Sequence, residues 1–141
     1  MGFSSFNHRP ERVKEVYDAV LGLLTLVDEG WWETRVAIDG RNLGFAIGGD
    51  TGPSPVLVAH ARELVRTFPE FDRRITAFLA EESRRLRLTP DQVQQLVMEE
   101  VMLTWPDRPD DGMIYFTGLE HLGVWRCDYI NRKPRGLGVD R

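Results

Sequence analysis

The residue best suited to act as a reactive group is Cys127, the single cysteine of the chain, which has charged and aromatic neighbours in the sequence. A cysteine becomes a nucleophile when a base such as histidine lies within hydrogen-bond reach, and His121 is the nearest histidine along the chain. In a strand, however, Cys127 shares its face with Trp125 and Tyr129, and apolar burial keeps a thiol protonated. We therefore expect Cys127 to be buried and structural, with catalysis by Cys127 and His121 as the alternative.

A second candidate is the glycine-rich loop at residues 48–55, which precedes an expected helix that carries His60. Backbone N–H groups at the start of a helix can hold an anion. This loop lacks the Lys-Ser/Thr pair of a P-loop and the spacing of a dinucleotide fingerprint, and Asp50 would repel a phosphate. We expect a plain strand-to-helix connection and a half-buried, hydrogen-bonded His60. The alternative is a small hydrolase or ligand-binding enzyme that uses this loop with His60.

The residue pattern contains no recognisable metal-binding or cofactor-binding motif. The three histidines lack ligand spacing on one helix, and a single cysteine gives no zinc signature. Asp107, Asp110 and Asp111 cluster in a proline-stiffened loop, but the spacing of a calcium-binding loop is absent. The sequence therefore predicts neither a metal ion nor a cofactor.

The bulk properties are those of a single globular domain over residues 1–141. A chain of 141 residues with 42% hydrophobic residues can bury a core without a metal or a disulfide. Its net charge of −4 argues against nucleic acid as the main partner. The longest apolar stretch, residues 19–27, is too short to span a bilayer, and no secretory signal precedes it. We expect a cytoplasmic protein that has no membrane partner.

Hydrophobic periodicity places strands first and helices second. Residues 1–17 form an N-terminal segment with a short helix after Pro10, and residues 18–48 predict a three-stranded meander with an Asp39-Gly40 hairpin turn. From Pro55 onward the period becomes helical, and a second helix follows at about 69–86. The apolar stripe of that second helix comprises Phe71, Ile75, Phe78, Leu79 and Leu86.

The second half of the chain returns to strands. We expect a helical turn at 90–95, strands at 97–105, 113–118 and 123–130, and an irregular basic tail at 131–141. The resulting order is β-β-β-α-α-β-β-β. Because strands and helices are segregated along the chain, this order predicts an α+β fold with a largely antiparallel sheet and the helix pair on one face.

Four stretches of the sequence carry a resemblance to known proteins: GWWET, FAIGGD, PDDGMIYFTG and VWRCDYINRKPRGLG. They resemble small bacterial proteins of unknown function and, more loosely, the α+β immunity-type proteins that accompany polymorphic toxins. The shared feature is a layout in which a β-meander, a helical middle and closing strands follow one another. No catalytic residue comes with the resemblance. It implies binding of a partner protein in the cytoplasm.

The alternation of the strand at 31–38 indicates where such a partner would bind. A large aromatic side chain among charged residues on an open sheet face is a frequent interface anchor. We therefore predict a non-enzymatic interaction domain that binds a partner protein or a second copy of the chain. The alternative is that the N-terminal segment, residues 1–17, covers Trp31. The residues predicted to form the binding face are Trp31, Glu33, Arg35 and Tyr115.

Overall fold

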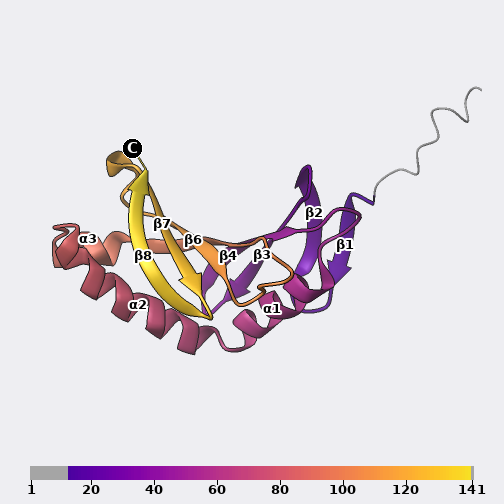
Figure 1. The fold of residues 1–141 in the computed structure, drawn as a ribbon, viewed down its shortest axis with the longest axis horizontal. Helices are drawn as coiled ribbons and strands as arrows, with labels where there is room; N and C mark the ends of the chain where they lie inside the picture. The colour runs from indigo at the N-terminus through magenta and orange to yellow at the C-terminus, as the bar shows by residue number, and fades with distance from the viewer. Residues whose placement is uncertain (1–12, 141) are drawn as a thin grey trace, which may run out of the picture.

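A computed structural model of the chain describes residues 13–140, and its eight strands form one sheet in chain order (Figure 1). The strands are β1 (Glu15–Asp18), β2 (Gly22–Asp28), β3 (Trp31–Ile38), β4 (Arg41–Gly48), β5 (Val97–Leu103), β6 (Gly112–Thr117), β7 (Val124–Ile130) and β8 (Lys133–Asp140). The helices are α1 (Pro55–Arg66), α2 (Phe68–Arg85), α3 (Pro90–Gln95) and the short 3-10 helix η2 (Glu120–Leu122).

The sheet consists of two antiparallel meanders that meet at its centre. Strands β1 to β4 form the first meander and β5 to β8 the second, and the pair β4–β5 between them is parallel. A parallel pair needs a long crossover connection, and α1, α2 and α3 supply it. The fold is therefore α+β with a largely antiparallel sheet.

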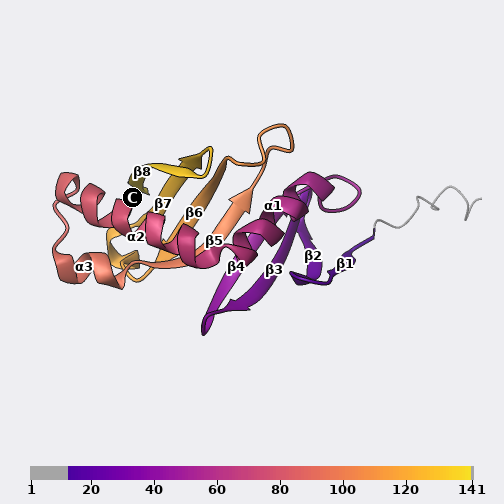
Figure 2. The ribbon, with the colours of Figure 1, turned by 90° about the horizontal axis from the view of Figure 1, so that it is seen from below.

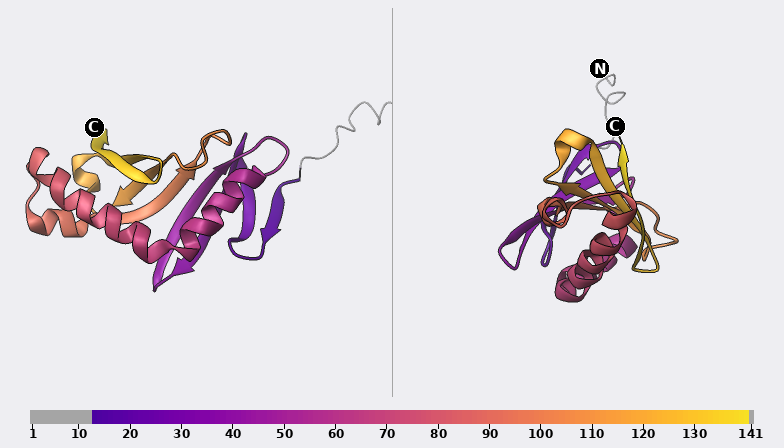
Figure 3. Two further views of the ribbon diagram at one scale, coloured as in Figure 1. Left: turned by 60° about the horizontal axis from the view of Figure 1, so that its bottom comes forward. Right: turned by 90° about the vertical axis from the view of Figure 1, so that its left-hand side faces the viewer.

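The helices form a second layer that lies against one side of the sheet. Figure 2 shows them in front of the strands when the molecule is seen from below, and Figure 3 shows the two layers from the side. Among residues 13–140, none of α1, α2 and α3 lies on the opposite side of the sheet (Figure 1). None of the described helices is long and apolar enough to cross a membrane.

The structure corrects the expected strand count at both ends of the sheet. Residues 15–18 form strand β1 where a helix was expected, so the first meander has four strands rather than three. The apolar run at 19–27 is divided by a turn in which the Asp18 carboxylate accepts hydrogen bonds from the N–H groups of Val20 and Leu21. The beginning of the expected helix, next to Pro10, lies outside the described residues.

The C-terminal tail is likewise a strand rather than irregular. Strand β8 pairs with β7 after a turn in which Asn131 and Arg132 both have positive φ, 53° and 63°. This is the left-handed pair that a tight hairpin requires. Asp39 and Gly40 turn the β3–β4 hairpin in the same way, as expected from the sequence. The observed element order is β-β-β-β-α-α-α-β-β-β-β.

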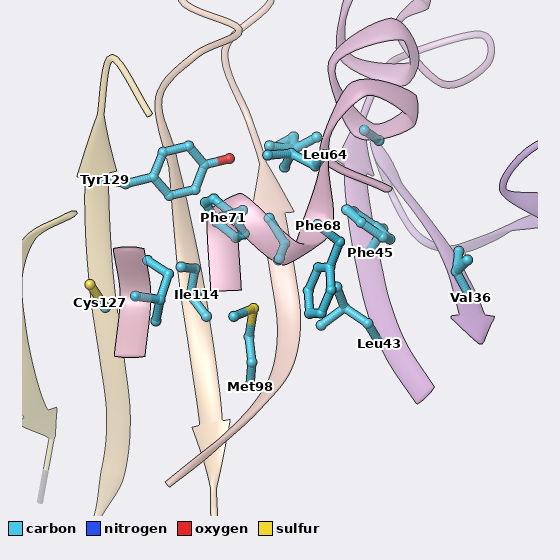
Figure 4. Packing of buried hydrophobic residues seen from close by; sticks show 14 of the residues in the cluster. Val36, Leu43, Phe45, Leu64, Phe68, Phe71, Met98, Ile114, Cys127 and Tyr129 are labelled. Atoms are coloured by element: carbon cyan, nitrogen blue, oxygen red, sulfur yellow. The ribbon is translucent and has the colours of Figure 1, made fainter. Parts of the chain in front are cut away.

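The hydrophobic core fills the space between the helices and the sheet (Figure 4). The buried stripe of α2 consists of Phe68, Phe71, Ile75 and Leu79, so Phe68 was missed by the sequence pattern. Phe78 and Leu86, which the pattern placed in the stripe, are only partly buried at its flank. The helical turn expected at 90–95 is α3, and its capping box between Thr89 and Gln92 fixes its start.

Candidate functional site

The helix-free side of the sheet brings Arg35 and Tyr115 into one row across its centre. Arg35 pairs with Gly44, Gly44 with Glu100, Glu100 with Tyr115, and Tyr115 with Arg126. Residues that are paired across strands point to the same face of a sheet. This row therefore places a carboxylate and a phenol between two guanidinium groups, with a glycine beside the carboxylate.

A second row runs parallel to the first on the same side of the sheet. It contributes a carboxylate at each end, a buried alanine in its floor and two half-buried methionines. We call the two rows together the open face. The second row consists of Glu33, Ala46, Met102, Met113 and Asp128.

Glu100 is the most perturbed group of the open face. Its carboxylate lies over Gly44, since a Cβ built there would stand 3.5 Å from Glu100 Oε2. Burial raises the pKa of the Glu100 carboxyl, and the negative charges of Glu33 and Glu99 raise it further while Arg35 lowers it. Among the described residues the Glu100 carboxylate has neither a hydrogen bond nor an ion pair.

The two arginines of the open face are already engaged by acidic residues. The Arg35 guanidinium forms an ion pair with Glu99, which bulges from β5 beside Glu100. Arg126 lies 3.4 Å from the Asp128 carboxylate and 3.9 Å from that of Asp140. The carboxylates therefore outnumber the guanidinium groups, and the face carries a net negative charge at its centre.

The residues predicted to bind a partner lie partly together. Glu33, Arg35 and Tyr115 belong to the open face, although strands β4 and β5 separate Arg35 from Tyr115. Trp31 follows the same alternation but sits at the end of β3, half-buried and paired with Gly48. The alternative prediction was that the N-terminal segment covers Trp31, and most of that segment lies outside the described residues. Sequence reasoning missed Glu100, the residue at the centre of the row.

Cys127 does not have the surroundings of a nucleophile. Its side chain is fully buried, and burial raises the pKa of the thiol to about 12. Within residues 13–140, the hydrogen bond recorded for the thiol is a long one of 3.6 Å to the Asp128 carbonyl oxygen. His121 is exposed in η2 and makes no recorded contact with Cys127. The expectation of a buried, structural cysteine is confirmed.

The glycine-rich loop is filled by its own backbone. A Cβ at Gly49 would lie 1.9 Å from the Gly52 carbonyl oxygen, so the loop closes on itself there. The Gly49 carbonyl oxygen accepts a hydrogen bond from the Trp32 indole at 3.0 Å, and Ser54 caps α1. The loop therefore connects β4 to α1 and leaves no space for an anion at Gly49. The His60 side chain makes its polar contacts with residues outside this loop.

His60 instead belongs to a buried polar cluster that sequence spacing did not reveal. Its Nδ1 lies 3.3 Å from Asp110 and its Nε2 3.4 Å from the Tyr129 hydroxyl, while Arg132 donates to Asp110 at 2.9 Å. With neutral His60, the Tyr129 hydroxyl donates to Nε2, and Nδ1–H lies beside the Asp110 carboxylate. The cluster ties α1 to the loop before β6 and to the β7–β8 turn.

The pKa directions in this cluster favour a structural role. Burial lowers the pKa of His60 and raises that of Tyr129, so both groups stay neutral near pH 7. A Cβ at Gly112 would lie only 2.5 Å from the Tyr129 hydroxyl oxygen, so backbone closes the space beside the phenol. The expectation of a hydrogen-bonded His60 is confirmed, but the residue is 5% exposed and therefore buried rather than half-buried.

No protein-family model matches the chain, and neither a curated protein nor a solved structure is significantly similar to it. Within residues 13–140, the acidic, histidine and cysteine side chains form no group that could hold a metal ion. The open face, with its half-buried carboxylate and its excess of acidic side chains, is the candidate binding site.

Proposed function

We propose that this chain is a non-enzymatic interaction domain whose open face binds a basic segment of a partner protein. The observation that carries the proposal is the half-buried Glu100 carboxylate, which lies over Gly44 without a hydrogen bond or ion pair to another described residue. A partly desolvated carboxylate among like charges is unfavourable in the free protein. A lysine or arginine from a partner would remove that penalty.

The negative charge of the open face favours a partner that carries basic side chains. Close charge pairs at protein interfaces have coupling energies of about 1.5 kcal/mol or more. Because Arg35 and Arg126 are engaged by acidic residues, a cationic side chain meets mainly Glu33 and Glu100. A second copy of the chain would bring the same negative face against itself, which is unfavourable. A different, basic protein is therefore the better partner.

The side chains around Glu100 suit contact with a polypeptide. Tyr115 offers an amphipathic ring, and tyrosine is enriched among residues that dominate binding energy. Met102 and Met113 are flexible and adapt to irregular apolar surfaces. Gly44 leaves room for the Glu100 carboxylate to lie over the backbone, and the short side chain of Ala46 keeps the neighbouring surface low. This combination gives a charged anchor surrounded by adaptable apolar contacts.

The resemblance to immunity-type proteins extends the proposal to a biological role. We propose that the basic partner is a toxin domain in the cytoplasm and that occupation of the open face inhibits it. The scattered positions of Cys127, His121, His60 and the glycine-rich loop support a binding role over the hydrolase alternative, because a reaction needs its groups in one pocket.

Charge reversal on the open face tests the proposal. The full chain is immobilised as wild type, as Glu100→Lys and as Glu81→Lys, and proteins retained from a lysate of the source cell are identified. Glu81 is an exposed residue of α2 and serves as the matched control because it lies on the helix side. The milder Glu100→Gln variant guards against misfolding of Glu100→Lys.

We expect one basic protein to be retained by the wild type and by Glu81→Lys but not by Glu100→Lys. With that protein purified, Glu100→Gln should weaken its affinity at least tenfold, and added salt should weaken wild-type binding steeply. Retention of the same protein by all three forms would contradict the proposal. An acidic partner would also contradict it.

A further inference from the structure

A groove of about 760 Å³ lies on the helix side of the molecule, on the opposite side of the sheet from the open face. Its volume falls within the range of small-molecule sites. Side chains of α2, α3, β5 and β6 line it, and most of them are apolar. Its apolar lining includes Ile75, Leu79, Val93, Met98 and Phe116.

The groove runs along α2. One wall is a row of α2 residues spaced by four positions, Asp72, Thr76, Ala80 and Arg84. At 1.5 Å per residue this row is about 18 Å long. One acyl chain spans roughly half of the ~30 Å hydrocarbon core of a bilayer, about 15 Å.

The two ends of the groove differ in their available charge. At one end Asp72 accepts two hydrogen bonds from Arg41, at 2.9 and 3.1 Å, and the Arg41 guanidinium also stacks over the Phe68 ring. At the other end Arg84 has no recorded ion pair with another described residue. Since Asp72 and Arg41 neutralise each other, the lining keeps one uncompensated positive charge, at Arg84.

We propose that this groove binds a long-chain fatty acid. The carboxylate of the fatty acid pairs with the Arg84 guanidinium, and the alkyl chain lies along the α2 wall past Ala80 and Thr76, toward the end at which Arg41 and Asp72 pair. The length of the groove, its apolar floor and its single free cation together match a linear anionic amphiphile. This site is independent of the open face, so failure of one proposal leaves the other intact.

Calorimetric titration of the full chain with dodecanoate, below its micelle-forming concentration, tests the site. Dodecanol and dodecylammonium are the control probes because they share the alkyl chain and differ in the head group. Ala80→Phe fills the groove, and Ala77→Phe is its matched control, since Ala77 is an exposed alanine of α2 outside the groove. Arg84→Gln removes the cation, and Arg73→Gln controls for loss of an exposed arginine elsewhere on α2.

We expect one dodecanoate per chain and clearly weaker binding of both control probes. Ala80→Phe should abolish binding, and Arg84→Gln should weaken it about tenfold, as loss of a charge-assisted bond predicts. Ala77→Phe and Arg73→Gln should bind as the wild type does. Equal binding of the three probes would overturn the proposal, as would wild-type affinity in Arg84→Gln. A wild-type dimer that Ala80→Phe dissociates would also overturn it, because a second copy would then occupy the groove.

Discussion

Replacement of Gly112 by alanine should destabilise the protein strongly. A Cβ at this position would lie 2.5 Å from the Tyr129 hydroxyl oxygen and 2.6 Å from its Cζ. Such contacts are far below van der Waals distance, so the ring must move. Tyr129 is 1% exposed, packs edge-on against Phe71 and bonds to His60, so little free space is available.

The expected cost has two parts. Overpacking in a well-packed core costs about 1–3 kcal/mol, and loss of the Tyr129–His60 hydrogen bond adds about 1 kcal/mol. We therefore expect Gly112→Ala to lower the free energy of unfolding by about 2–4 kcal/mol. Urea denaturation followed by tryptophan fluorescence measures this change.

Gly136→Ala is the matched control because no atom lies within 4 Å of the Cβ position there. It should change the free energy of unfolding by less than about 1 kcal/mol. The double variant Gly112→Ala with Tyr129→Phe should recover part of the loss, since it removes the closest atom. A Gly112→Ala variant as stable as Gly136→Ala would refute the close packing around Tyr129 and its structural role.

Three further predictions concern charge and the thiol. The hydrogen bond from the Arg62 side chain lowers the pKa of Asp18 from 3.8 to about 2, so the ion pair stabilises the fold fully above pH 4 and is lost as pH falls through 2. Asp18→Asn should cost about 1 kcal/mol at pH 7, after allowance for the half-exposed guanidinium, and clearly less near pH 2, where Asp18 is about half protonated, in thermal melts. An equal loss at both pH values would contradict this origin. Because the pKa of Glu100 is raised in the folded protein, ionisation of its carboxyl opposes folding at pH values above the usual pKa of glutamate. Glu100→Gln should therefore stabilise the free protein by ~0.5 kcal/mol at pH 7, as measured by urea titration. A destabilised variant would show that the Glu100 carboxylate has a stabilising partner in the folded protein. Cys127 should resist a thiol reagent until the protein unfolds, and rapid stoichiometric labelling of the native state would disprove its burial.

The sequence pattern predicted those elements whose signals are local. Asp39-Gly40 marks a hairpin because both residues adopt positive φ, and the hydrophobic period of α2 identifies most of its buried stripe. Strand β8 was missed because its turn uses Asn131 and Arg132, neither of which is glycine. Strand β1 was missed because Val13, Val16 and Tyr17 recur at three and four residues, a spacing that favours a helix.

The candidate site was only partly predictable for a related reason. Alternation within one strand placed Glu33 and Arg35 on the same face, which the register bears out. Glu100 follows a bulge between Met98 and Glu100 that shifts the alternation of β5, and its neighbours come from strands distant in sequence. The His60 cluster joins residues about fifty and seventy positions apart, and no local pattern specifies such contacts.

Site-specific photocrosslinking in the source cell tests the central claim most directly. A photoreactive phenylalanine derivative replaces Tyr115 on the open face or, as a control, Ala77 on the exposed side of α2. The proposal predicts an adduct from position 115 to a peptide of net positive charge, no such adduct from position 77, and loss of the adduct when Glu100→Lys is added. An adduct from position 77 alone, an acidic crosslinked peptide, or an adduct that survives Glu100→Lys would contradict the assignment of the open face as the binding site.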